Sequence, residues 1–175
     1  MMARSDQRDV EMAVQPTIVQ RDAQPYVGRR ESITMTEFAR VADHLPTMFG
    51  GLAERGAPIA GAPFFRYRLI DMSADLVVEA GIPVSGPVEV EEPTFVDTLP
   101  AGRYATVSHV GHPDELMAVT ARLLDWAQDE GLQWDMSPTL EGEMWGCRLE
   151  ILMTNPAEEP DMHRWETVLM FRLAD

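Results

Sequence analysis

Lysine is absent from this sequence, and all fourteen of its basic residues are arginines. Without lysine the chain cannot form a Schiff base with a carbonyl substrate or use a lysine as a catalytic base. It also cannot build a Walker-type phosphate loop, which needs a lysine next to its final glycine. These classes of chemistry are therefore excluded.

Cysteine and long apolar runs are scarce as well. The single cysteine, Cys147, cannot form a disulfide within the chain or a cysteine-rich zinc site, and we interpret it as a small buried hydrophobic residue. No run approaches the roughly 18 apolar residues of a membrane-spanning helix, and residues 1–15 lack the apolar centre of a signal peptide. We expect a soluble cytoplasmic protein without membrane contact.

Positive charge is sparse relative to negative charge. The formal net charge is -15 at pH 7 and the pI is near 4.5. From residue 91 onward, seventeen acidic residues stand against five arginines. Nucleic-acid binding draws on clustered basic side chains, so we expect no direct contact with nucleic acid. The charge favours a cationic ligand or a basic protein partner.

What the chain does contain is a pattern that occurs twice. Pro16-Thr-Ile-Val19 returns as Pro93-Thr-Phe-Val96, and each copy precedes a second strand-like run, at 26–32 and 104–110. A helical pattern closed by glycine follows in both halves, and then two more strand candidates: 64–71 and 76–80 in the first half, 145–153 and 165–173 in the second.

The second helix has the clearer signals. Pro113 suits its first position, apolar residues from Leu116 to Ala127 share one face, and Gly131 suits its cap. In the first half Pro46 must break or restart the helix, which leaves 46–55 as the main segment.

Each half therefore reads strand, helix, strand, strand. This order predicts an α+β fold, a tandem βαββ repeat with a mainly antiparallel sheet and a central cleft between pseudo-twofold related halves. We expect a flexible leader at residues 1–15 and one domain at 16–175, made of repeats at about 16–85 and 93–175.

Glu150 is the most informative residue, because it interrupts a run that otherwise reads as a buried strand. An ionised carboxylate there is costly unless a partner or a function needs it. Trp145 precedes Glu150 on this strand, and Trp165 begins the strand that can pair with it, which suggests an aromatic cavity containing one acid. Alternatively, the side chain of Glu150 points to solvent or forms a surface ion pair with Arg148 or Arg172.

Several segments resemble the GyrI-like small-molecule-binding domains, which occur alone and as effector-binding domains of AraC-type and MerR-type transcription regulators. The resemblance rests on Leu99-Pro-Ala-Gly-Arg-Tyr104, the helix end Trp126 to Gly131, Arg148-Leu-Glu150 and Thr154-Asn-Pro156. It extends over about residues 16–175. It implies the tandem βαββ fold and a ligand, often cationic or a lipophilic aromatic, bound between the repeats.

The resemblance also implies roles for particular residues. Glu150 matches a buried glutamate that faces the ligand, and Tyr67 occupies the equivalent strand of the first half. We add Trp145, Trp165 and Leu152 as expected ligand-binding residues. The leading interpretation is a stand-alone domain that captures a hydrophobic and, we expect, cationic aromatic ligand, without a cofactor.

Two other functions follow from the same resemblance. One is hydrolysis of small electrophilic compounds, with Glu150 as the base and Tyr67 as its partner. The other is modulation of a protein partner, as in gyrase-inhibitor-like proteins. The segment before residue 16 is too short for a helix-turn-helix, so we do not expect a self-contained transcription factor.

His109 and His112 have a spacing that invites a metal interpretation. Sequence places no third ligand beside them, and His112 could instead cap the following helix. We expect no metal site.

Overall fold

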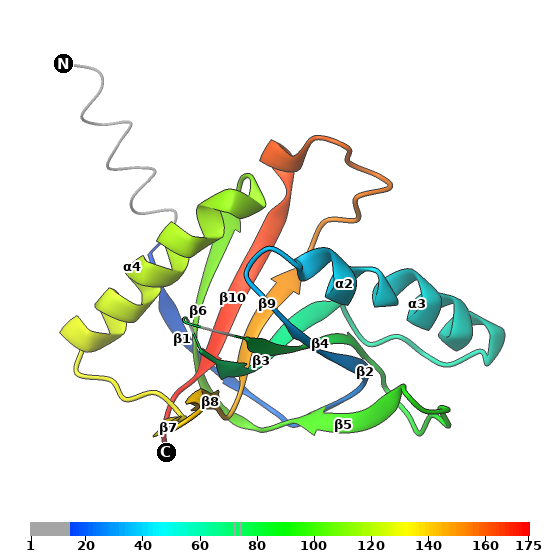
Figure 1. The fold of residues 1–175 in the computed structure, drawn as a ribbon, viewed down its shortest axis with the longest axis horizontal. Helices are drawn as coiled ribbons and strands as arrows, with labels where there is room; N and C mark the ends of the chain where they lie inside the picture. The colour runs from blue at the N-terminus through cyan, green and yellow to red at the C-terminus, as the bar shows by residue number, and fades with distance from the viewer. Residues whose placement is uncertain (1–14, 72, 74) are drawn as a thin grey trace.

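The computed structural model describes residues 15–71, 73 and 75–175. The leader predicted for residues 1–15 lies outside these, apart from Gln15. Ten strands of the described residues form one curled sheet, and the helices lie against it (Figure 1). Among the described residues, no helix combines the length and apolar character needed to cross a membrane.

The strands form two groups along the chain and one added hairpin. The first group is β1 (Thr17–Arg21), β2 (Gln24–Ile33), β3 (Phe64–Ile70) and β4 (Leu76–Pro83). The second is β5 (Phe95–Leu99), β6 (Gly102–Val110), β9 (Arg148–Leu152) and β10 (Glu166–Arg172). The hairpin is β7 (Met136–Thr139) with β8 (Gly142–Trp145).

The spatial order of the strands is β1-β6-β10-β9-β3-β4-β2-β5. This order reads the same from both ends, because β9 corresponds to β3, β10 to β4, β6 to β2 and β1 to β5. The symmetry confirms the predicted α+β fold with two related halves. The halves meet where β3 pairs with β9, and Phe65 lies opposite Glu150 at this seam.

The first strand of each group is exchanged between the halves. β1 pairs with β6 of the second group, and β5 pairs with β2 of the first group. Neither group of strands therefore completes its half of the sheet alone.

The helices pack on one face of the sheet. Figure 1 shows α4 (Leu116–Asp129) over β6 at one side, and α2 (Phe38–Ala42) and α3 (His44–Glu54) over β2 and β4 at the other. Pro46 does not mark the break between α2 and α3, because that break falls at Asp43. Pro46 lies in the first turn of α3, where a missing N–H costs no intrahelical hydrogen bond.

The prediction of one strand at 145–153 is wrong, because the structure has two strands there, β8 and β9. The β7–β8 hairpin was not predicted. The pairing with β7 continues up to Gly146, whose backbone N–H donates to the Asp135 carbonyl over 2.8 Å, one step beyond the Met136–Trp145 pair. The chain re-enters the sheet at Arg148 as β9. The predicted hairpin pairing of the next strand is confirmed, because β10 pairs antiparallel with β9.

The two faces of the sheet carry separate cores. The helical face holds the larger cluster, which includes Val41, Leu52, Leu123 and Phe171. The opposite face holds a second cluster that contains Cys147. Cys147 is fully buried, and burial raises the pKa of its thiol, so the prediction of a buried hydrophobic residue is confirmed.

A charged network lies on the same face as the second cluster. Glu79 on β4 is fully buried and accepts hydrogen bonds from Tyr26 (2.5 Å), Arg30 (2.7 Å) and Arg68 (3.0 Å). Arg68 also pairs with Asp97 over 2.8 Å. The buried Glu79 carboxylate therefore has two arginine partners, as a buried charge requires.

Candidate functional site

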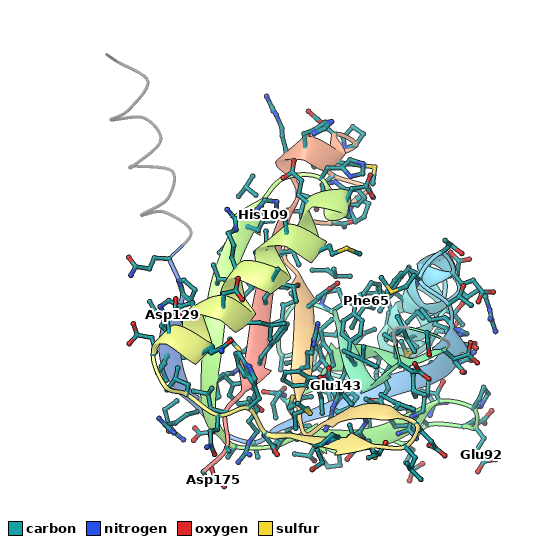
Figure 2. The ribbon with its side chains drawn as sticks, turned by 60° about the vertical axis from the view of Figure 1, so that its left-hand side comes forward. Phe65, Glu92, His109, Asp129, Glu143 and Asp175 are labelled. Carbon is teal, nitrogen blue, oxygen red and sulfur yellow. The ribbon has the colours of Figure 1, made fainter. Side chains whose placement is uncertain are left out.

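A pocket of about 780 Å³ opens on the helical face of the sheet. Its floor comes from β3 and β9, and its walls come from α2 and α4. Figure 2 shows the labelled Phe65 and Glu143 in the region between α4 and the α2–α3 pair. The lining residues that matter most for charge are Glu150, Arg148, Tyr67, Glu143 and Asp114.

Strand alternation decides which residues of β9 reach the pocket face. Side chains two residues apart on a strand share a face, so Arg148, Glu150 and Leu152 lie together. Leu149 and Ile151 point the other way and pack in the second cluster. On the neighbouring strand, Phe65 and Tyr67 occupy the same face as Glu150.

Glu150 lies in the pocket close to Tyr67. Loss of hydration raises the pKa of the Glu150 carboxyl group, while a hydrogen bond from the Tyr67 hydroxyl and the charge of Arg148 act against this rise. The same burial and the nearby carboxylate raise the pKa of Tyr67, so the phenol stays protonated and donates.

The alternative of a surface ion pair does not describe Glu150. Arg172 pairs with Asp135 over 2.9 Å, on a different part of the sheet. Among the described residues, no arginine lies within ion-pair distance of Glu150. Glu150 is therefore a pocket carboxylate that lies beside the neutral phenol of Tyr67.

Arg148 is held by aromatic rings. Its guanidinium carbon lies 4.5 Å from the ring centre of Phe171, 4.8 Å from that of Trp145 and 5.7 Å from that of Tyr67. Burial lowers the pKa of Arg148, and the carboxylates of Glu150 and Glu143 oppose that effect. The guanidinium group remains charged, because even a lowered arginine pKa stays far above neutral pH.

Two of the predicted ligand-binding residues line the pocket, and three lie elsewhere. Glu150 and Tyr67 are lining residues. Trp145 lies behind Arg148 and stacks against Trp134 and Phe171. Trp165 donates its indole N–H to the Glu159 carbonyl over 2.7 Å in the loop before β10. Leu152 packs against the main core and is outside the lining set.

The apolar walls were not predicted from the sequence. They consist of Met35, Phe38, Phe65, Ile70, Leu76, Leu116, Met117, Ala121 and Leu124. The signal on α4 was a second apolar stripe, Leu116, Met117, Ala121 and Leu124, beside the buried stripe of Val119, Leu123 and Ala127. For Arg148 the signal was its position two residues before Glu150, on the same strand face.

The two histidines singled out in the sequence have local roles. His109 bonds the Glu115 carboxylate over 2.8 Å, and His112 accepts from the Asp114 N–H at the start of the turn Pro113–Glu115 (η1). His112 is thus a cap, which was one of the two interpretations. Within the described part of the chain, no cluster of three metal-ligating side chains occurs.

The comparison with family models decides the family. A model of the GyrI-like small molecule binding domain matches residues 14–144. The chain belongs to the GyrI-like family. The matched region includes Tyr67 and α4 and ends before Arg148 and Glu150. No curated protein matches the chain.

Solved structures share the GyrI-like fold at low sequence identity. The C-terminal domain of EcmrR is similar at a TM-score of 0.74 and 17% identity, over 93% of this chain and 98% of that one. EcmrR in its complex with DNA is similar at a TM-score of 0.76 and 16% identity over 99% of this chain. This chain spans only 62% of the length of that EcmrR chain. SAV2435 bound to tetraphenylphosphonium is similar at a TM-score of 0.52 and 12% identity, over 91% of this chain and 94% of that one.

Proposed function

We propose that this GyrI-like domain binds a hydrophobic, positively charged small molecule in the pocket on the helical face. The observation that supports this most is Glu150, a carboxylate without an ion-pair partner among the described residues, in a pocket with largely apolar walls. SAV2435, a protein of similar fold, is bound to tetraphenylphosphonium, which is a lipophilic cation.

The electrostatics of the pocket favour such a ligand. Burial destabilises the ionised form of Glu150 and raises its pKa. A ligand cation beside the carboxylate stabilises that form, so binding recovers part of the desolvation cost. The cavity volume of about 780 Å³ lies within the range of about 300–1,000 Å³ that holds drug-sized ligands.

The test is a titration with a fluorescent lipophilic cation, the methyl ester of a rhodamine dye, followed by dye anisotropy. Glu150→Gln keeps the shape and a hydrogen-bond acceptor for Tyr67 but removes the charge. We expect the Kd to rise at least about tenfold, the order of one lost charge-assisted hydrogen bond.

Glu141→Gln is the matched control, because Glu141 is exposed in the β7–β8 turn and does not line the pocket. This variant has the same change in net charge and should bind like the wild type. Equal affinity of wild type and Glu150→Gln for the dye would reject the role of Glu150.

We infer hydrolysis as a second candidate function, because the Tyr67 phenol and the Glu150 carboxyl group lie close together in the same pocket. A carboxylate with a raised pKa is suited to accept a proton from water near neutral pH. A protein of similar fold, at a TM-score of 0.61 and 12% identity, is a hydrolase from Listeria innocua. Product release from a panel of electrophilic esters and epoxides that stops in Glu150→Gln would favour this function over binding alone.

A further inference from the structure

Arg148 is a partly buried cation in the same pocket, and no carboxylate among the described residues lies within ion-pair distance of it. Its Nε atom is fully buried and has no hydrogen-bond partner there. Three other arginines of the sheet have carboxylate partners: Arg172 pairs with Asp135, Arg30 with Glu79, and Arg68 with both Glu79 and Asp97. The buried Arg66 on β3 instead donates to the Tyr26 hydroxyl and the Gly146 carbonyl. A desolvated guanidinium normally requires such a partner.

The pocket therefore contains two opposite charges that do not neutralise each other. Arg148 and Glu150 lie on one face of β9, two residues apart, which places their backbone positions about 7 Å from each other. Three aromatic rings surround the guanidinium of Arg148, and the Tyr67 hydroxyl lies near the carboxylate of Glu150. Each charge is thus fixed separately and faces the same cavity.

We propose that the ligand is amphoteric, an inference that rests on the proposed function. Besides its cationic group near Glu150, the ligand carries an anionic group, such as a carboxylate, that pairs with Arg148. A guanidinium binds a carboxylate through two parallel hydrogen bonds, and this geometry gives both affinity and orientation. Arg148 then sets which end of the ligand enters the pocket first.

The aromatic cage supports this assignment. The sequence predicts that Trp145 stacks on the ligand, but its ring and that of Phe171 face the guanidinium of Arg148. These ring faces are not free for a ligand cation. The cationic group of the ligand therefore pairs with Glu150. Glu143 and Asp114 also line the pocket, and they repel an anion that lies too far from Arg148 to pair with it.

A pair of rhodamine dyes tests the proposal, one with a free carboxyl group and the other its methyl ester. The two share one cationic ring system and differ only in the anionic group. In wild-type protein we expect the free acid to bind at least about tenfold more tightly than the ester. High salt in both titrations screens the long-range attraction between the negative net charge of the protein and the cationic ester.

Arg148→Met removes the guanidinium and keeps a flexible apolar stem of similar shape. In this variant the affinity ratio of the two dyes should fall to about one. Arg122→Met is the matched control, because Arg122 is exposed on α4 and does not line the pocket. Its ratio should equal that of the wild type.

The outcomes separate this proposal from the proposed function. Tight binding of the ester that is lost in Glu150→Gln, with no preference for the free acid, would overturn the role of Arg148 and leave the proposed function intact. Failure of both dyes to bind the folded wild type would reject both. If Arg148→Met does not fold, the wild-type ratio alone decides.

Discussion

At the scale of single residues, burial raises the pKa of Glu150 against the opposing effects of Tyr67 and Arg148. Burial favours the neutral acid, whereas the Tyr67 hydroxyl and the Arg148 charge favour the anion. The net direction is a raised pKa, so burial outweighs the two partners. A ligand cation adds a third contribution on the side of the anion, and binding and ionisation are therefore linked.

Glu150→Gln is expected to flatten the pH dependence of stability. Because the pKa of Glu150 in the folded protein is raised above the ordinary value of 4.5, the folded state keeps a proton that the unfolded chain has already released. The wild-type free energy of unfolding therefore decreases as pH rises from the unfolded-state pKa through the folded-state pKa. Glutamine cannot ionise and avoids this loss.

Urea unfolding across a pH series measures the effect. Glu150→Gln should be more stable than the wild type at neutral pH, and the difference should vanish below the ordinary glutamate pKa. Glu141→Gln, at an exposed position, should follow the wild-type curve. Parallel curves for wild type and Glu150→Gln would mean that the carboxylate is not desolvated.

Residue-level prediction from the sequence reached part of the pocket. Glu150 was identifiable because a carboxylate in an apolar strand is costly, and Tyr67 because of the relation between the two halves. Trp165 could not be placed, since its indole hydrogen bond to the Glu159 carbonyl depends on the path of the preceding loop. The pocket walls on α2 and α4 depend on how the helices pack, which periodicity alone does not show.

At the scale of elements, the β7–β8 hairpin is held against β3 by a very close backbone approach. Gly142 has φ +137, and a Cβ at this position would lie 2.5 Å from the Ile70 carbonyl oxygen. The hairpin carries Glu143 to the edge of the pocket. Only glycine satisfies both the backbone conformation and the contact.

Gly142→Ala is expected to destabilise the protein by about 2–4 kcal/mol, because the cost of backbone strain and the cost of a clash with the main chain of Ile70 add to each other. Gly56→Ala is the matched control: Gly56 also has a positive φ, of 62, but a Cβ added there would have no neighbouring atom within 4 Å. It should cost only about 1–2 kcal/mol. Equal losses in the two variants, measured by urea unfolding, would show that the contact with β3 contributes nothing.

The helices were more predictable than this hairpin. The apolar spacing and the glycine cap of α4 are local signals, and the sequence placed that helix within a few residues. The strand predicted at 145–153 spans two strands, because Gly146 still bonds Asp135 in the β7–β8 pairing whereas β9 begins at Arg148 and pairs with β10. A local pattern contains no information about such a partner.

At the scale of the whole molecule, the exchanged strands join the two halves into one cooperative unit. β1 depends on β6, and β5 depends on β2. The order of strands within each half followed from the repeated sequence pattern. The exchange did not, because β1 and β5 carry the same pattern whichever half they join.

The two halves are expected to unfold together. All four tryptophans, at positions 126, 134, 145 and 165, lie in the chain after β6, so tryptophan fluorescence reports on that part of the chain and far-ultraviolet circular dichroism reports on the whole sheet. Because the strand exchange removes independent halves, the urea midpoints from the two probes should coincide. A circular dichroism transition at lower urea than the fluorescence transition would reveal separate unfolding of the first half.

The strand exchange also determines when the sheet can form during synthesis. β1 leaves the ribosome long before β6, its pairing partner, has been translated. Until β5 emerges, β2 likewise presents a bare edge, the kind of surface to which other chains add strands. The nascent chain must keep both segments unpaired through much of translation, and the complete sheet assembles only late in synthesis.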